Sequence, residues 1–219
     1  KDDITRLANA ERDSRRGEAL LKQQDFVNAA ELLRQAMEVR KQLLGTANPL
    51  HVVDLLKLSL AQKFSDEAAG KFDSEEPFDL VESAFSIIQE LVPAAECPGG
   101  HPLVIQVGNS LAETAKRLGQ YDRSQTTYAA ILAIQRSRFP EAQHPKGHAD
   151  ILAAMLGLAE SLLRLEQYDA ALKVIHEGLA MAKLLNPQGD INAATLHLYE
   201  SQIALSKANY VQARHAPAF

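Results

Sequence analysis

The chain has 219 residues, a net charge of −5 and 23% charged residues, so neither its size nor its charge balance indicates a nucleic-acid or membrane-surface protein. The one cysteine, Cys97, excludes an intrachain disulfide framework and fits a reducing compartment. No apolar run approaches the roughly 18 residues that cross a bilayer, and no signal peptide is visible. We therefore expect an intracellular, cytoplasmic protein with no membrane and no nucleic-acid partner. Because the sequence starts at Lys1 rather than Met, we interpret it as a fragment of a longer protein.

Apolar residues recur at helical spacing along the chain, and Gly or Pro residues separate the periodic segments. No stretch combines strand-like alternation with β-branched enrichment. The pattern predicts an all-α fold. The predicted helices are 3–23, 26–44, 50–69, 78–92, 102–118, 121–138, 147–165, 168–185, 190–207 and 210–214.

One spacing of residues recurs along these helices. In its first copy the small residue Gly17 is followed at fixed distances by Leu20, Phe26, Ala29 and Leu33. Later copies keep a bend aromatic at the place of Phe26, and the second copy reaches it only after an acidic insertion that should lengthen its turn. The bend aromatics are Phe26, Phe78, Tyr121, Tyr168 and Tyr210. They divide a single predicted domain, 1–219, into repeats 3–48, 49–100, 101–146, 147–189 and an incomplete 190–219.

This spacing is that of an antiparallel helical hairpin. Small residues let two helices approach closely, so we expect Gly17 to face Ala29 and Ala112 to face Ser124. The aromatic after the turn closes the open end of each hairpin. Because each hairpin leaves one apolar face uncovered, consecutive hairpins must stack into a solenoid.

The pattern resembles the tetratricopeptide repeat (TPR), and more narrowly the long variant found in kinesin light chains. Two features carry the narrower resemblance: long second helices, as in "AMEVRKQLLGTANPLHV", and linkers with Pro beside His, as in His101-Pro102 and His144-Pro145. The resemblance covers about residues 10 to 214. It implies a right-handed α-solenoid of about five antiparallel repeats that acts as a non-catalytic scaffold or adaptor for a protein or peptide partner.

In such a superhelix the first helices of the repeats line a concave groove, where we expect the partner to bind. Asn109 stands in "NSLA", which matches the Asn-x-Leu-Ala element with which related repeats hold the backbone of a bound peptide. An amide suits this role because it donates and accepts hydrogen bonds at once. The predicted peptide-binding residues are Asn109, Glu113, Lys116, Gln106, Leu156, Glu160, Leu163, Leu198 and Gln202. The same reasoning adds Ser14, Glu18, Lys22, Leu58, Gln62, Ser65 and Leu205 to the groove.

Candidate catalytic and metal-binding residues are few. His144 and His148 have the spacing of a zinc pair on a helix, but Pro145 and Gly147 lie between them, so we interpret both as solvated loop residues. The carboxylates of residues 65–79 lack the order of a calcium loop and indicate a solvated acidic insertion. We predict no enzyme activity, no cofactor, no metal and no small-molecule substrate.

Two alternative functions stay open at this point. The chain could be a structural spacer in a larger, possibly cytoskeletal, assembly that uses its convex face and edges. It could also be a regulatory segment attached to a catalytic domain outside this sequence. The sequence identifies neither the partner nor the oligomeric state.

Overall fold

The computed structural model describes residues 2–72, 74–93, 97 and 100–215, with side chains as far as residue 208 in the last helix. All regular structure in these residues is helical, which confirms the predicted all-α solenoid class. The helices are α1 (Asp2–Lys22), α2 (Phe26–Leu44), α3 (Pro49–Ala68), α4 (Glu76–Leu91), α5 (Pro102–Arg117), α6 (Tyr121–Arg138), α7 (Ala149–Arg164), α8 (Tyr168–Leu185) and α9 (Ile191–His215).

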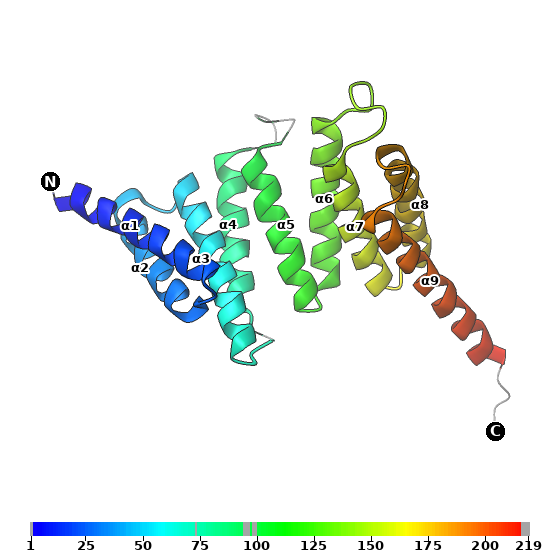
Figure 1. Cartoon of the computed structure of the whole chain (residues 1–219), viewed down its shortest axis with the longest axis horizontal. Helices are drawn as coiled ribbons and strands as arrows, with labels where there is room; N and C mark the ends of the chain where they lie inside the picture. Colours follow the sequence, from blue (N-terminus) through cyan, green and yellow to red (C-terminus); the bar gives the residue numbers. More distant parts are fainter. Residues whose placement is uncertain (1, 73, 94–96, 98–99, 216–219) are drawn as a thin grey trace. The chain divides into compact units, whose positions relative to one another are not determined.

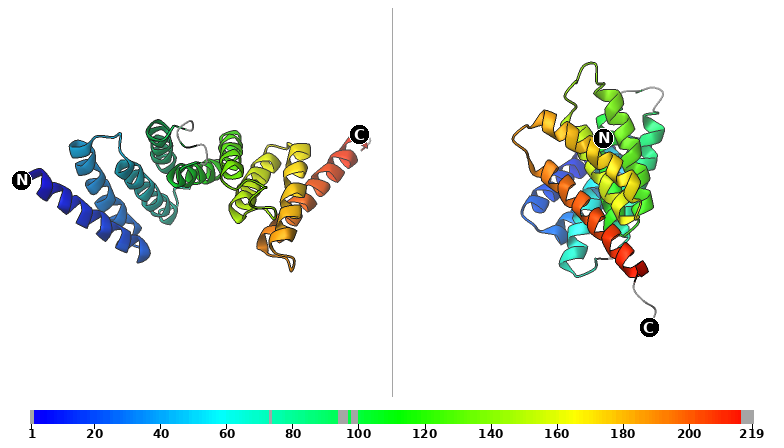
Figure 2. Two further views of the ribbon diagram at one scale, coloured as in Figure 1. Left: turned by 90° about the horizontal axis from the view of Figure 1, so that it is seen from above. Right: turned by 90° about the vertical axis from the view of Figure 1, so that its right-hand side faces the viewer.

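The helices belong to two compact units, Lys1–Leu118 and Gly119–Phe219. In the first unit, each of α2 to α5 packs on the helix before it, so these helices lie side by side in chain order (Figure 1). In the second unit, each of α7 to α9 packs on the helix before it, and α9 also contacts α7 (Figure 2). The boundary between the units falls inside the predicted repeat 101–146. One domain over 1–219, and the repeat borders within it, stay predictions.

The short turns that precede α2, α6 and α8 share one backbone conformation. Gln24, Gly119 and Glu166 have positive φ angles of 63°, 72° and 58°. Each lies two residues before the aromatic residue that begins the next helix. At the first turn, the backbone N–H groups of Asp25 and Gln24 donate to the carbonyl oxygens of Leu20 and Leu21, which is the Schellman arrangement. The left-handed residue thus ends one helix and reverses the chain into its partner.

The linker histidines cap the first helices of two repeats. His101 Nδ1 accepts a hydrogen bond from the backbone N–H of Leu103 at 3.1 Å, and His148 Nδ1 accepts one from Asp150 at 3.2 Å. Each cap satisfies an N–H group that has no partner within its own helix. Pro102 follows His101 at the first helical position, where its missing N–H has no cost. The His101-Pro102 linker is therefore the start of α5.

Small residues set the distance between neighbouring helices, as predicted. A Cβ added at Gly17 would lie 2.8 Å from Leu33 Cγ and 3.4 Å from the carbonyl oxygen of Ala29, so Gly17 does face Ala29. In the second unit, a Cβ at Gly157 of α7 would lie 2.3 Å from Tyr128 Cζ of α6. Gly157 does not stand out in the sequence, because the repeated spacing concerns only pairs of helices joined by a short turn.

An apolar core over α4 fixes α3 and α5 in one unit. Phe78, the second bend aromatic, is buried in it, together with residues of α3 and α5. The wholly or nearly buried members of this core are Val52, Leu55, Phe78, Val81, Ala84, Ile88, Val107, Leu111 and Ala115. Because the same side chains pack on both helices, the surfaces of α3 and α5 beside this core have a defined relation to one another.

The acidic insertion lengthens the turn between α3 and α4, as predicted. Its Phe72 side chain is exposed, but its backbone is held: Arg117 of α5 donates to the carbonyl oxygens of Phe72 and Ser74, at 2.9 and 3.2 Å. A charged donor makes such bonds stronger than neutral ones. The insertion is therefore anchored to α5 through its main chain.

The predicted bend before Tyr210 is wrong, because α9 runs unbroken from Ile191 to His215. By analogy with the other turns, a bend would require a positive φ two residues before the aromatic, at Ala208. Alanine has the highest helix propensity, which favours continuation of the helix through this position. The predicted helices 190–207 and 210–214 are consequently one helix.

Gly157→Ala should lower the free energy of unfolding by about 1 to 2 kcal/mol, because the added methyl group would overlap the buried Tyr128 ring. Gly17→Ala is the matched control: its methyl group meets a leucine side chain that can change rotamer, so its loss should be smaller. Urea denaturation of the two variants measures the difference. Equal stability of Gly157→Ala and the wild type would show that the close approach is not needed.

Candidate functional site

A groove of about 250 Å³ lies between α3, α4 and α5 of the first unit. Its wall on α5 carries Asn109 and Glu113, and its apolar side carries Leu56 and Leu60 of α3. The floor reaches the buried Val81 of α4. The complete lining is Leu56, Ser59, Leu60, Lys63, Val81, Asn109, Ser110, Glu113 and Thr114.

Two hydroxyl groups in this groove, those of Ser59 and Thr114, are already satisfied by main-chain acceptors. Ser59 Oγ donates to the carbonyl oxygen of Pro77 at 2.7 Å, and Thr114 Oγ1 donates to that of Ser110 at 2.7 Å. Both side chains are buried. They therefore help to fix α3 and α5 and leave little hydrogen-bonding capacity for a ligand.

The amide of Asn109 differs from the amides of four other asparagines. Asn28, Asn48, Asn186 and Asn192 each donate to a neighbour two or three residues away in the chain. Among the described residues, the exposed side chain of Asn109 has no such bond. Asn109 thus presents a free donor and a free acceptor at the wall of the groove.

Charged groups flank this amide. Lys116 Nζ lies 3.1 Å from Glu113 Oε1, one turn further along α5, which pairs these two predicted site residues. Lys63 of α3 lines the groove, and its Nζ lies 5.4 Å from the centre of the Phe64 ring. The groove therefore has an apolar floor, a free amide and at least one cation on its rim.

The structure brings together some of the predicted site residues and not others. Asn109 and Glu113 line the groove, whereas Gln106 is exposed on α5 outside it. Lys116 is half-buried and does not line the groove, but it pairs with Glu113, which does. In the second unit, Leu156, Glu160 and Leu163 are half-buried on α7, while Leu198 and Gln202 are exposed on α9. A peptide-binding role for all of these residues stays a prediction.

Two residues placed in the groove by sequence are buried instead, so those predictions are wrong. Ser14 and Leu58 are each 1% exposed, and Leu58 packs in an apolar cluster with Leu33 of α2. Both lie three residues before the small residue of their helix, Gly17 or Ala61. Asn109 lies three residues before the buried Ala112 in the same way and is exposed, so the position within the repeat does not by itself decide which side chains are open.

Sequence reasoning placed α3 in the groove but chose other residues of that helix than those that line it. Leu56, Leu60 and Lys63 are spaced four and three residues apart, so they lie on one face of α3. Leu60 is 46% exposed, which is unusual for a leucine in a helix that is otherwise packed on two sides. The periodic pattern contained this face, but only the packing angle between hairpins decides which face meets the groove.

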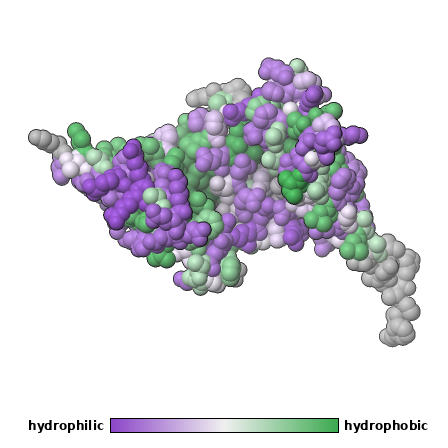
Figure 3. Space-filling view, viewed as in Figure 1, coloured by the Kyte–Doolittle hydropathy of each residue, from purple (hydrophilic) through white to green (hydrophobic). Residues whose placement is uncertain are grey.

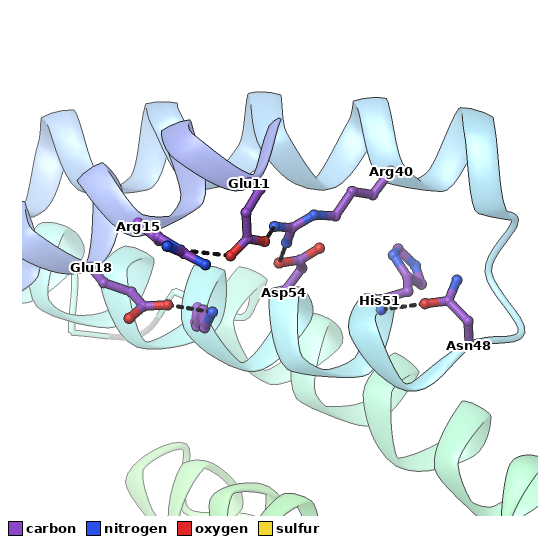
Figure 4. A network of polar contacts seen from close by, with 8 residues as sticks. Glu11, Arg15, Glu18, Arg40, Asn48, His51 and Asp54 are labelled. Atoms are coloured by element: carbon purple, nitrogen blue, oxygen red, sulfur yellow. Dashed lines mark hydrogen bonds and ion pairs between the residues drawn. The ribbon is translucent and has the colours of Figure 1, made fainter. Parts of the chain in front are cut away.

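A second polar cluster, shown in Figure 4, lies between α1, α2 and α3. Arg40 is 5% exposed and donates to Asp54 of α3 and, at 2.5 Å, to Glu11 Oε2 of α1. A hydrogen bond from Arg15, aided by the charge of Arg40, holds the pKa of Glu11 below its ordinary value. Arg15 and Arg40 balance the charges of Glu11 and Asp54 and the cluster joins three helices, but Asp54 Oδ2 is buried without a hydrogen-bond partner.

A third feature is a cavity of about 430 Å³ beneath the loop between α6 and α7. The Phe139 ring stacks on His148 at 3.5 Å between ring centres, and His144 contacts Phe139 edge-on at 5.2 Å. Both histidines are half-buried, so the solvated-loop interpretation is wrong. Gly147 permits this fold of the loop, because its φ is +84° and a Cβ there would lie 2.5 Å from Met181 Cγ.

No group of three or more His, Cys, Asp or Glu side chains within the described ranges is arranged to hold a metal ion. Across the part of the chain that the structure describes, no helix combines the length and apolar character needed to span a bilayer.

Residues 6–50 match the family model of the tetratricopeptide repeat. The predicted resemblance to this repeat is confirmed. The TPR-like repeat protein of Podosopora anserina described as a candidate kinesin light chain superposes with a TM-score of 0.66 at 16% identity, over 97% of this chain and 99% of that one. A single-substitution variant of that protein gives 0.68 at 16% identity, over 95% of this chain and 94% of the variant.

BtubC (BKLC) of P. vanneervenii superposes with a TM-score of 0.60 at 19% identity, over 100% of this chain and 86% of that one. No curated protein matches the chain in sequence. At these identities the structural likeness establishes the TPR-like fold alone. The function must therefore be argued from the side chains of this chain.

Arg40→Met should lower the free energy of unfolding by about 3 to 5 kcal/mol, because it leaves the buried Asp54 carboxylate without a countercharge. The double variant Arg40→Met/Asp54→Leu should recover most of this loss, since an apolar pair leaves no buried charge. Urea denaturation of both single variants and the double variant gives the coupling. Additive effects would show that the two side chains do not interact.

His51 should make stability depend on pH. It is buried at the start of α3, and burial lowers its pKa below the ordinary value, against the opposing charge of Asp54. The unfolded chain then takes up a proton near pH 6.5 while the folded chain stays neutral, so the free energy of unfolding should fall as the pH drops below about 6.5. His51→Leu should flatten this slope relative to the wild type in urea denaturation between pH 7.5 and 5.5. Parallel slopes would contradict the assignment.

Proposed function

We propose that this chain is a non-catalytic protein-binding module that holds a peptide segment of a partner in the groove between α3 and α5. The observation that carries the proposal is the free amide of Asn109 on the wall of a groove with an apolar floor. The TPR-like fold supports it, since solenoids of this kind present extended concave surfaces to their partners.

The chemistry of the groove suits a peptide. One amide can accept a hydrogen bond from a backbone N–H and donate one to a backbone carbonyl, which fixes an extended chain without reading its sequence. Leu56, Leu60 and Val81 then supply an apolar contact for one partner side chain, which gives the selectivity. The binding energy would come from few residues, as is usual at protein interfaces.

The size of the groove favours a peptide over a small-molecule substrate. Its volume of about 250 Å³ is below the range of about 300 to 1,000 Å³ that encloses a typical small ligand. A space of this size accommodates one or two side chains while the rest of the peptide stays on the surface. The proposed activity is therefore recognition without chemical conversion.

Asn109→Ala should weaken peptide binding about 10- to 100-fold, because the desolvated backbone groups of the peptide lose their partners. A peptide selected from a phage-displayed library on the wild-type chain is the probe, and calorimetry measures its affinity. The melting temperature should hardly change, since Asn109 is exposed.

Gln89→Ala is the matched control, because Gln89 is exposed on α4 of the same unit and does not line the groove. Its affinity for the selected peptide should equal that of the wild type. Equal affinity of the Asn109→Ala and wild-type chains for every selected peptide would remove the groove as the binding site.

A further inference from the structure

Helix α9 exposes an apolar stripe along the side opposite its packed face. Ile191, Leu198 and Leu205 are 77%, 55% and 63% exposed and follow one another at intervals of seven residues. Leu196 and Ile203 point the other way and are buried. Figure 3 shows apolar atoms gathered along this helix. Seven-residue spacing keeps the three large side chains on one line, as in a helix that pairs with another helix.

Small residues alternate with the large ones along this stripe. Three residues after each large side chain comes a small one, Ala194, Ser201 or Ala208, and all three are exposed. Ser201 Oγ donates to the carbonyl oxygen of His197 at 2.8 Å, so its hydroxyl is satisfied within the helix. The stripe therefore reads large, small, large, small, large, small over residues 191–208.

When two copies of this helix lie antiparallel, the large residues of one copy face the small residues of the other. In an antiparallel pair with a two-fold axis between Tyr199 and Glu200, Ile191 faces Ala208 of the other copy, Ala194 faces Leu205, and Leu198 faces Ser201. Each large side chain thus meets a small one, which is the condition for close helix packing without overlap. A two-fold contact also requires such a self-complementary surface.

Charges on α9 are directed away from this stripe. Glu200 contacts His176 of α8 at 3.0 Å and His197 at 3.3 Å, and Lys207 contacts Asp169 of α8 at 2.9 Å. The positions that flank the stripe are Thr195, His197, Gln202 and Ala204, which carry no permanent charge. Two copies can therefore approach along α9 without like-charge repulsion.

We propose that α9 pairs with α9 of a second copy of this chain in an antiparallel, two-fold dimer. The stripe spans 18 residues, or about 27 Å of helix, so one helix pair falls at the small end of specific protein interfaces, below about 1,200 Å². The dimer is accordingly one that forms and dissociates with concentration. In this dimer Leu198 and Gln202 contact the second copy, whereas the sequence predicted that they bind a peptide. The dimer does not depend on Asn109.

Sedimentation velocity over a range of protein concentrations tests the dimer. The wild-type chain should shift from monomer to dimer, and Leu198→Glu should weaken association at least about tenfold, because it puts a charge into the apolar seam. Val27→Glu is the matched control, since Val27 of α2 is 66% exposed and lies outside the stripe. A wild-type chain that stays monomeric at every concentration, or a Leu198→Glu chain that associates like the wild type, would overturn the proposal.

Exchanging a small residue of the stripe with the large residue that it should face tests the antiparallel alignment independently. Ala194→Leu should weaken association, because it sets leucine against Leu205 of the other copy, and Ala194→Leu/Leu205→Ala should restore it. In a Cys97→Ser background, a mixture of Leu198→Cys and Ser201→Cys chains should form disulfide dimers faster than either chain alone. No rescue by the double variant, or faster cross-linking of the unmixed chains, would overturn the antiparallel arrangement.

Discussion

The close approach of neighbouring helices at small side chains is the constraint on which the rest of the structure depends. Gly17 admits α2 to within contact of α1, and Gly157 admits the Tyr128 ring to the surface of α7. Ala61 and Ala159 occupy fully buried positions on their helices in the same way. Helices held this close must interlock along their whole contact, so the position of one hairpin fixes the next within each unit. A surface groove can keep its shape only because the helices that form it cannot slide.

The helices were predictable because their ends carry local signals. The bounds of α2, α6 and α8 agree with the predicted ranges 26–44, 121–138 and 168–185. At each of these starts, a residue with positive φ and an aromatic two residues later define the turn. Tyr210 has the aromatic, but the backbone two residues before it stays helical, so the same motif failed there. A repeated aromatic predicts a bend only when the turn that precedes it has the right backbone chemistry.

The groove was only partly predictable for a different reason. The residue pattern of α5 predicted that Asn109 faces the groove, and Asn109 does lie at its wall. Ser14 and Leu58 occupy equivalent positions and are buried, while Lys63 and Leu60 enter the groove from a neighbouring helix. These differences depend on how far each hairpin is rotated against the next. Sequence periodicity fixes which residues share a face, but the angle between packed helices decides which face is open.

Polar groups in this chain fall into two classes, those whose hydrogen bonds or ion pairs are made within the fold and those left without such partners. Arg15 and Arg40 balance the charges of Glu11 and Asp54 inside the first unit, and the linker histidines use their ring nitrogens for helix caps. The amide of Asn109 is left free beside an apolar floor. Satisfied groups hold the fold together but have little left to offer a partner, since a new bond would first require an old one to break. Recognition is therefore expected where the fold leaves hydrogen-bonding capacity or apolar surface unused, and the charge count of a surface is a poor guide to it.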